Sequence, residues 1–255
     1  MKKTGLLSAL VCCSIMAMAW GQTGHRVVGK VAENHLSKKA KEALECIMGY
    51  EGLAEASTWM DNIKSDSVYD HTHQWHYVTI PDGKDYHSCE VADGGDAYEA
   101  INRMVAIIKN NEASKQEKVE AIRMLTHLVG DIHQPLHVGN GEDRGGNSVK
   151  IKWFYKNSNL HRIWDSGMID SKQYSFSELA EIIDHAPEST IVKLQNDKID
   201  VWIAEAMSLR PQIYYIEGQE NLSYEYQYKN WDTVKDQLFK AGVRLAGILN
   251  EALDC

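Results

Sequence analysis

The sequence lacks any apolar run long enough to cross a membrane as a helix, which takes about 20 residues. Its main apolar stretch, residues 6–18, follows two lysines and ends in an Ala-Met-Ala sequence just before Trp20. A basic start, a short apolar segment and small residues at the last and third-last positions are typical of a secretory signal peptide. We therefore expect residues 1–19 to be removed. The mature protein would begin at Trp20 and be secreted or periplasmic, without a membrane anchor.

Cysteine is scarce. Two of the five cysteines lie in the expected signal peptide, which leaves Cys46, Cys89 and Cys255. An odd number in an oxidising compartment allows at most one disulfide and leaves at least one free thiol. The sequence does not decide the pairing, although a bond between Cys89 and Cys255 would tie down the end of the chain.

Positive charge is also in deficit. The chain has 27 Lys and Arg against 36 Asp and Glu, a formal charge of −9, and the signal peptide would take two of the lysines with it. Proteins that act on nucleic acid usually present a basic face. Either the substrate is not a polyanion, therefore, or positive charge is supplied by something else, such as bound metal ions.

Internal repeats, linkers and low-complexity runs are absent, so we expect one domain over residues 20–255. Apolar residues at helical spacing predict a mainly α fold. A Gly-Gly-Asn turn followed by SVKIKWFY predicts a small β-hairpin within residues 139–159, and residues 75–80 form a second candidate extended piece. The expected helical segments are Arg26–Gly49 (broken near Ser37), Ser57–Lys64, Ala97–Asn110, Gln116–Gln134, Pro187–Leu209 and Trp231–Leu253.

Histidine and aspartate recur at a spacing that suits metal binding. His127 and Asp131 are four residues apart, on one face of an expected helix, and His161 and Asp165 repeat that spacing. His137 follows Asp131 closely. Imidazole nitrogen and carboxylate oxygen both suit Zn²⁺. A single pair of this kind is equally consistent with an ion pair at the surface. Two pairs together with His137 predict a metal centre.

The expected new N-terminus carries metal-binding groups of its own. Cleavage before Trp20 would expose an α-amine next to its carbonyl group, and the two can chelate a metal ion. The pKa of an α-amine is about 8, so that a metal can displace its proton. His25 opens the first expected helix, within reach of this terminus. We therefore expect Trp20 and His25 to belong to the metal centre.

Several longer motifs point to one family. They lie in order along essentially the whole mature chain, and they resemble the successive motifs of the S1/P1 nuclease family, which has a mainly helical phospholipase C/P1 nuclease-like fold. The motifs are WGQTGH at 20–25, STWMDNIK at 57–64, WHYV at 75–78, THLVGDIHQPLHVGN at 126–140, GGNSV at 145–149, NLHRIWD at 159–165 and a Trp-x-x-Glu element at 202–205.

The resemblance implies three zinc ions. The first would take Asp61, His76, His127 and Asp131; the second would take the amine and carbonyl of Trp20 with His25 and share Asp131; the third would take His137, His161 and Asp165. The charge of three Zn²⁺ exceeds that of the three carboxylates. The cleft would then attract phosphate although the rest of the protein is acidic.

The resemblance also implies a reaction, the hydrolysis of single-stranded DNA or RNA to 5′-phosphorylated products, with 3′-nucleotidase activity. A metal-activated hydroxide would attack phosphorus, and a zinc ion would neutralise the leaving oxygen. Asp61 would orient the hydroxide, and Lys64 would stabilise the pentacoordinate state. No stable protein partner is implied.

The same family places a base-binding pocket beside the metals. Tyr77 would stack on an unpaired base, an interaction of about 1–3 kcal/mol that tolerates sequence. Gly145, Gly146 and Asn147 would line the pocket. Thr79 stands where fungal members carry an acidic residue that contacts the base, so the base preference stays open.

Two other functions fit part of the pattern. Zinc-dependent phospholipases C share the His-x₃-Asp-x₅-His spacing, but they typically end on Glu rather than on a residue like Asp165, and their first His is more distant than His25. A non-catalytic periplasmic zinc-binding protein would not need a shared Asp131 or Lys64. We expect the remaining histidines to have structural roles rather than to bind metal, and we expect His71 and His73 to be loop residues.

Overall fold

The computed structural model describes residues 20–216 and 218–254, so the expected signal peptide and Cys255 lie outside the described residues. The fold is mainly helical, as the sequence predicts. No helix in the described part of the chain is both long and apolar enough to span a bilayer.

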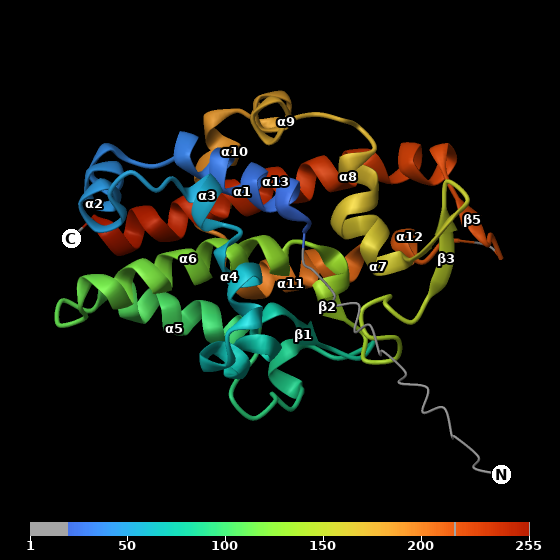
Figure 1. Ribbon diagram of the computed structural model, residues 1–255, viewed down its shortest axis with the longest axis horizontal. Coiled ribbons are helices and arrows are strands. Elements are labelled where there is room, and N and C mark those ends of the chain that lie inside the picture. Colours follow the sequence, from blue (N-terminus) through green and yellow to red (C-terminus); the bar gives the residue numbers. More distant parts are fainter. Residues whose placement is uncertain (1–19, 217, 255) are drawn as a thin grey trace, which may run out of the picture.

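The longest helix, α13 (Tyr224–Leu253), runs along the length of the molecule (Figure 1). Helix α1 (Gln22–Asn34) packs against it, as do α2 (Lys38–Met48), α9 (Phe176–Ile183) and α10 (Glu188–Gln195). Helices α5 (Ala97–Lys109) and α6 (Lys115–Ile132) pair with each other, and both also contact α13. One apolar core fills the space between these helices.

The helix boundaries follow local chemistry. Ser37 caps α2, because its hydroxyl accepts a hydrogen bond from the backbone N–H of Ala40. Ser114 and Glu117 form a reciprocal capping box at the start of α6. Helix α6 ends at Ile132, shortly before Pro135, which cannot continue a helix. The sequence predicts these three boundaries to within two residues.

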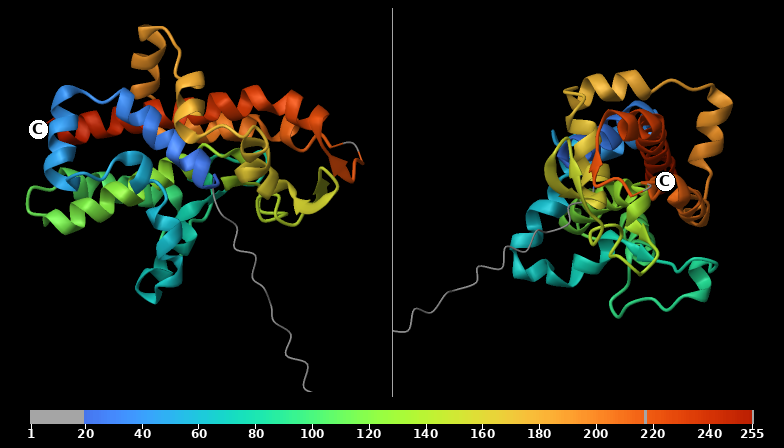
Figure 2. Two further views of the ribbon diagram at one scale, coloured as in Figure 1. Left: turned by 45° about the horizontal axis from the view of Figure 1, so that its top comes forward. Right: turned by 90° about the vertical axis from the view of Figure 1, so that its right-hand side faces the viewer.

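Short segments join the long helices, and most of the expected site residues lie on them. In the left-hand view of Figure 2, the cyan segment around residues 60–76 projects from the helical body. The short helices are α3 (Leu53–Ala56), α4 (Trp59–Asn62), η1 (Ile63–Ser65), η2 (Ser67–His76), η3 (Tyr86–Ser88), η4 (Pro135–His137), α7 (Leu160–Arg162), η5 (Ile163–Gly167), α8 (Met168–Asp170) and α12 (Arg210–Ile213).

The β structure is small. Strand β3 (Lys150–Trp153) forms the expected antiparallel hairpin with β4 (Lys156–Asn159), and β5 (Asn221–Leu222) adds to β3 in parallel. Figure 1 shows this sheet at one end of the molecule, near the start of α13. A second, two-stranded parallel sheet joins β1 (Val78–Thr79) to β2 (Val138–Gly139). Residues 78 and 79 therefore confirm part of the extended piece expected at 75–80.

Two predicted helices are wrong in extent. Residues 187–209 form two helices, α10 and α11 (Ile199–Ser208), because the chain turns at Asn196 so that α10 packs on α13 while α11 contacts α6 and β2. Helix α13 begins at Tyr224 rather than at residue 231. Its extra turns are held by Tyr226, whose hydroxyl donates to the carbonyl of Ile213 at 2.7 Å and accepts from the indole of Trp164 at 2.9 Å.

Candidate metal centre

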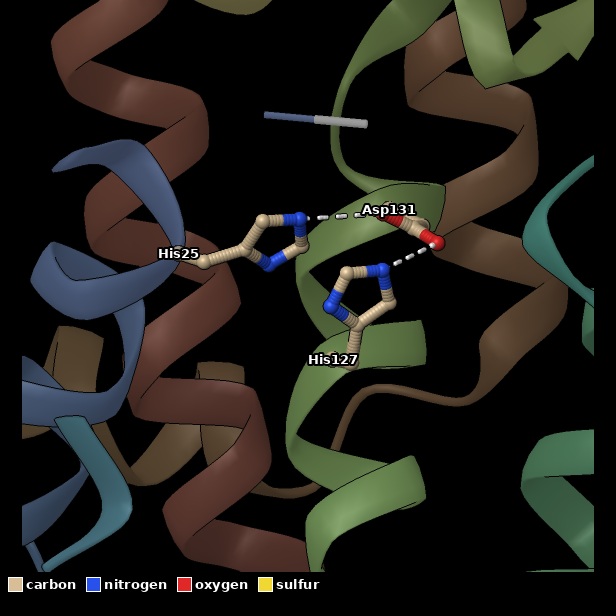
Figure 3. A group of neighbouring side chains, drawn as sticks. All are labelled: His25, His127 and Asp131. Atoms are coloured by element: carbon tan, nitrogen blue, oxygen red, sulfur yellow. Dashed lines mark ion pairs between the residues drawn. The ribbon is translucent and has the colours of Figure 1, made fainter. Parts of the chain in front are cut away.

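Helix α6 carries the central pair of the site. His127 and Asp131 are both fully buried, and Nε2 of His127 lies 3.3 Å from Oδ2 of Asp131. His25, from α1, reaches the other side of the same carboxylate, with Nε2 3.3 Å from Oδ1 (Figure 3). The rings of His25 and His127 stack with centroids 3.9 Å apart. Gly130 permits this approach, because a β-carbon there would lie 2.8 Å from Nδ1 of His25.

A second group adjoins the first through His127. Asp61 lies on α4 and His76 at the end of η2. Nε2 of His127 is 3.8 Å from Oδ1 of Asp61 and 3.2 Å from Nδ1 of His76, which is in turn 2.8 Å from Oδ2 of Asp131. One potential ligand atom from each of Asp61, His76 and His127 lies within 4.8 Å of the others, the spacing of groups that could hold one metal ion. The same is true of His25, His127 and Asp131.

A third group is formed by residues of η4, α7 and η5. Nε2 of His161 is 3.3 Å from Oδ2 of Asp165, and Nε2 of His137 is 3.9 Å from Oδ1. All three side chains are buried. The helix expected under His161 and Asp165 is a short α-turn that passes into a π-turn at Ile163.

Trp20 enters this region at the start of the described chain. Its side chain is fully buried, and the N–H of Gly21 donates to the carbonyl of Asp165 at 2.8 Å. A β-carbon on Gly24 would lie 3.0 Å from that of Trp20. The Trp20 segment, expected from the sequence to join the centre with His25, therefore lies beside the third group. It also lies near His25, because a β-carbon on Gly130 would be 3.9 Å from Cδ1 of Trp20 and 2.8 Å from Nδ1 of His25.

The donor atoms of these groups are suited to cations. Ten buried side-chain nitrogen or oxygen atoms in the described residues lack a hydrogen-bond partner, and seven of them belong to this cluster. Unpaired buried polar atoms are costly, so their concentration here indicates a missing partner. The seven atoms are Nδ1 and Nε2 of His25, Oδ2 of Asp61, Oδ1 of Asp131 and Nε2 of His76, His137 and His161.

Backbone carbonyls fix the orientation of three imidazoles. His127 donates from Nδ1 to the carbonyl of Ser57 at 2.7 Å, and His161 donates to that of Gly145 at 2.6 Å. His137 donates to the carbonyl of His76 at 2.6 Å. With the proton on Nδ1, each ring turns the lone pair of Nε2 toward the centre, which is the arrangement of metal-binding histidines.

Three of the imidazoles, and the carboxylate of Asp131, have protonation states that suit metal binding. Burial lowers the pKa of His25 and of His76 to about 4 and that of His161 to about 3, so these rings are neutral near pH 7. Burial alone would raise the pKa of Asp131, but His127 and the other imidazoles around it hold that pKa well below its usual value. Burial raises the pKa of Asp165 well above its usual value.

The cluster opens into a cleft of about 540 Å³. His76, His137 and His161 line it, together with Lys64, whose Nζ donates to Oδ1 of Asp61 at 2.5 Å. The lining also includes three expected base-pocket residues, Tyr77, Gly145 and Asn147. Gly146 is buried instead, and its carbonyl accepts from the N–H of His161 at 3.4 Å.

Some site residues escape sequence reasoning. The amide of Gln134 donates to Oδ1 of Asp165 at 2.6 Å and its carbonyl oxygen accepts from the N–H of Leu136. The only sequence signal is its place between α6 and Pro135. His73 and Arg144 also line the cleft. His71 and His73 both lie in η2 rather than in the loop expected for them.

The fold and the site together define a class of helical protein in which three adjoining buried histidine–aspartate groups lie beneath a cleft. Such groups are suited to binding several divalent metal ions. The family model described as S1/P1 Nuclease matches residues 20–254, and the chain belongs to that family. It is accordingly an enzyme, a hydrolase of phosphodiester bonds.

Relatives with this likeness occur in plants and fungi. Endonuclease 4 of Arabidopsis thaliana is 31% identical over 92% of this chain and 89% of its own, and endonuclease 2 of the same plant is 30% identical over 91% and 89%. Nuclease S1 of Aspergillus oryzae is 27% identical over 95% of each chain. Among solved structures, an alpha toxin from Clostridium absonum covers 93% of this chain and 66% of its own, with 17% identity and a TM-score of 0.49, too low to carry function across.

Proposed function

We propose that residues 20–255 are a secreted or periplasmic zinc-dependent phosphodiesterase that hydrolyses single-stranded DNA and RNA to 5′-phosphorylated products and also acts as a 3′-nucleotidase. The observation that carries this proposal is the set of three adjoining buried histidine–aspartate groups with unpaired donor atoms beneath an open cleft. Family membership and the endonuclease names of the relatives support it.

The donor chemistry favours zinc. Imidazole nitrogens dominate the three groups, each completed by a carboxylate, and this mixture suits Zn²⁺ better than Mg²⁺ or Ca²⁺, which prefer oxygen ligands. Asp131 contacts both His25 and His76, so one carboxylate would serve two ions. The amine and carbonyl of Trp20 would complete the ligands of His25. The family match, which begins at residue 20, supports that start of the mature chain.

When bound, the zinc ions would supply Lewis acidity toward phosphate oxygens and lower the pKa of the attacking water. The chain's own residues would position the reactants. Lys64 would direct its ammonium at the negative charge that grows on the phosphoryl oxygens, and its contact with Asp61 fixes it at the cleft wall. Asp61 keeps one unpaired oxygen, which would orient the attacking water.

The cleft wall also supports a preference for single strands. Tyr77 is 45% exposed and lines the cleft directly after His76, so an unstacked base could lie on its ring. A base inside a duplex offers no free face of this kind. Asn147 and the backbone of Gly145 would offer hydrogen-bonding groups to the base edge.

The test compares substrates on the zinc-loaded protein. Purified protein that starts at Trp20 would be given single-stranded DNA, duplex DNA, single-stranded RNA, a 3′-mononucleotide and phosphatidylcholine. We expect cleavage of the single strands to 5′-phosphorylated products, release of phosphate from the mononucleotide, loss of both activities in EDTA and recovery with zinc. Hydrolysis of phosphatidylcholine alone, or EDTA-resistant cleavage, would overturn the proposal.

Two matched substitutions localise the activity. Asp131→Asn would remove the shared carboxylate and should lower the rate by more than about 10²-fold, since even outer partners of metal ligands are worth 10–100-fold. Asp200→Asn changes an aspartate that pairs with His87 at the surface, away from the cleft lining, and should leave the rate unchanged.

A further inference from the structure

Arg144 has a backbone conformation that is costly for its residue type. Its φ is 60°, in the left-handed region that favours glycine. Three other non-glycine residues in the described chain share a positive φ: Phe154, Tyr155 and Gln173. Of these four, Arg144 alone lines the cleft. A costly conformation that persists at the wall of a site points to a role for the side chain.

The loop around Arg144 holds that conformation firmly. Asn147 donates to the carbonyl of Arg144 from its backbone N–H at 3.4 Å and from its side-chain amide at 3.0 Å. The carboxylate of Asp143 accepts from the N–H of Gly146 at 2.8 Å. Because the carbonyl of Gly145 also orients His161, the loop that presents Arg144 is fixed to the metal centre.

The positive charge of Arg144 has no ion-pair partner within the described residues. Its side chain is exposed and forms no ion pair there, whereas Arg123 and Arg210 each pair with a carboxylate. The cleft lining contains the cations Lys64 and Arg144 and no carboxylate. Lys64 already contacts Asp61, which leaves Arg144 as the lining cation without an acidic partner.

We propose that Arg144 binds a phosphate of the substrate strand next to the one that is cleaved, and so makes the enzyme prefer polynucleotides to mononucleotides. This rests on the proposed function. A guanidinium can make two parallel hydrogen bonds to one phosphate, and its charge is fixed over the physiological pH range. A 3′-mononucleotide has a single phosphate, which the centre itself would hold, so it offers Arg144 nothing to bind.

The experiment uses zinc-loaded full-length mature protein and two substrates, a single-stranded oligodeoxynucleotide and a 3′-mononucleotide. Arg144→Gly removes the cation and suits the backbone, so its Tm should equal or exceed that of the parent. Its kcat/KM for the oligonucleotide should fall about 10- to 100-fold, the range for a lost hydrogen bond to a charged group. The slope of log(kcat/KM) against log salt should become shallower by about 1, and kcat/KM for the mononucleotide should not change.

Two further variants separate charge from loop geometry. Gln173→Gly relieves a similar conformation, with φ 59°, away from the cleft lining, and should leave kcat/KM unchanged for both substrates. Arg144→Lys should recover part of the rate that Arg144→Gly loses on the oligonucleotide. Lysine restores the positive charge but cannot make the two parallel hydrogen bonds of a guanidinium. Equal losses on both substrates, or no loss on the oligonucleotide, would overturn the role of Arg144. Failure of the parent protein to cleave single strands would instead refute the proposed function.

Discussion

The backbone N–H of Gly21 donates to the backbone carbonyl of Asp165 at 2.8 Å. This contact joins the first described turn of the chain to the turn that carries the third histidine–aspartate group. It brings the residue before it, Trp20, to the centre, while His25 reaches Asp131 one helical turn later. Two motifs about 140 residues apart in the sequence thus belong to one site.

Gln134 positions Asp165, and its removal should weaken metal binding without unfolding the protein. Gln134→Ala would delete the amide that donates to Oδ1 of Asp165 at 2.6 Å. Partners of this kind are worth 10–100-fold in metal affinity. We expect a loss of about that size in zinc affinity, measured by competition with a chromogenic chelator. Gln116→Ala, on the exposed start of α6, serves as the control, and equal affinities in the two variants would refute the role of Gln134.

Arg244 stabilises the fold behind α6. It is fully buried and donates to His133 at 3.0 Å, to Glu205 at 2.8 Å and to Asp197 at 2.7 Å. Arg244→Met would leave Nε2 of His133 without a partner and remove the buried cation from Glu205 and Asp197, which keep only the more exposed Lys240 and Lys193, and we expect a loss of about 3–5 kcal/mol in the free energy of unfolding.

Urea denaturation of the zinc-loaded protein measures this loss. The matched control is Lys109→Met, which breaks an exposed ion pair with Glu251 and should cost less than about 1 kcal/mol. Similar losses in the two variants would show that the buried network stabilises the fold no more than an exposed ion pair does.

The metal-free protein should lose stability as the pH falls below about 6.5. The pKa values of His25 and His76 are about 4 and that of His161 about 3 in the fold, against 6.5 for an exposed histidine. Between these limits the unfolded chain takes up protons that the folded chain does not, so acid favours unfolding. Asp165 and His127, whose pKa values are raised in the fold, act in the opposite sense.

Each of the three imidazoles steepens this loss of stability by up to about 1.4 kcal/mol per pH unit near pH 5. Urea denaturation of EDTA-treated protein at pH 7, 6 and 5 measures it. A free energy of unfolding that stays constant or rises toward pH 5 would contradict the neutral state of the buried imidazoles.

The sequence could predict those parts of the site that depend on local spacing. His127 and Asp131 share a face of α6 because four residues make about one turn, and capping residues mark where that helix begins. The sequence also places a hairpin within residues 139–159, but the turn of that hairpin is formed by Phe154 and Tyr155, both with positive φ, and not by the Gly-Gly-Asn sequence that precedes β3. Family motifs supplied the rest of the expected ligands, which no local rule relates to one another.

What the sequence could not show depends on distant contacts. Arg244 meets His133 across 111 positions of the chain, and nothing near either residue indicates the pairing. Strand β5 has two residues, too few for a pattern, and exists because it lies beside β3. The tyrosine-rich residues 224–228 form the first turns of α13 because Tyr226 packs inward, while Tyr224 and Tyr228 stay exposed.

The most direct test of the metal centre is the zinc content of two proteins, one that begins at Trp20 and one that carries a single extra residue before it. Only the first has a free α-amine at Trp20, which we propose as a metal ligand. We expect three zinc ions per chain and full cleavage of single-stranded DNA from that protein, and a zinc deficit with a large loss of rate from the extended one. Equal zinc content and equal rates would contradict the assignment of Trp20 to the centre.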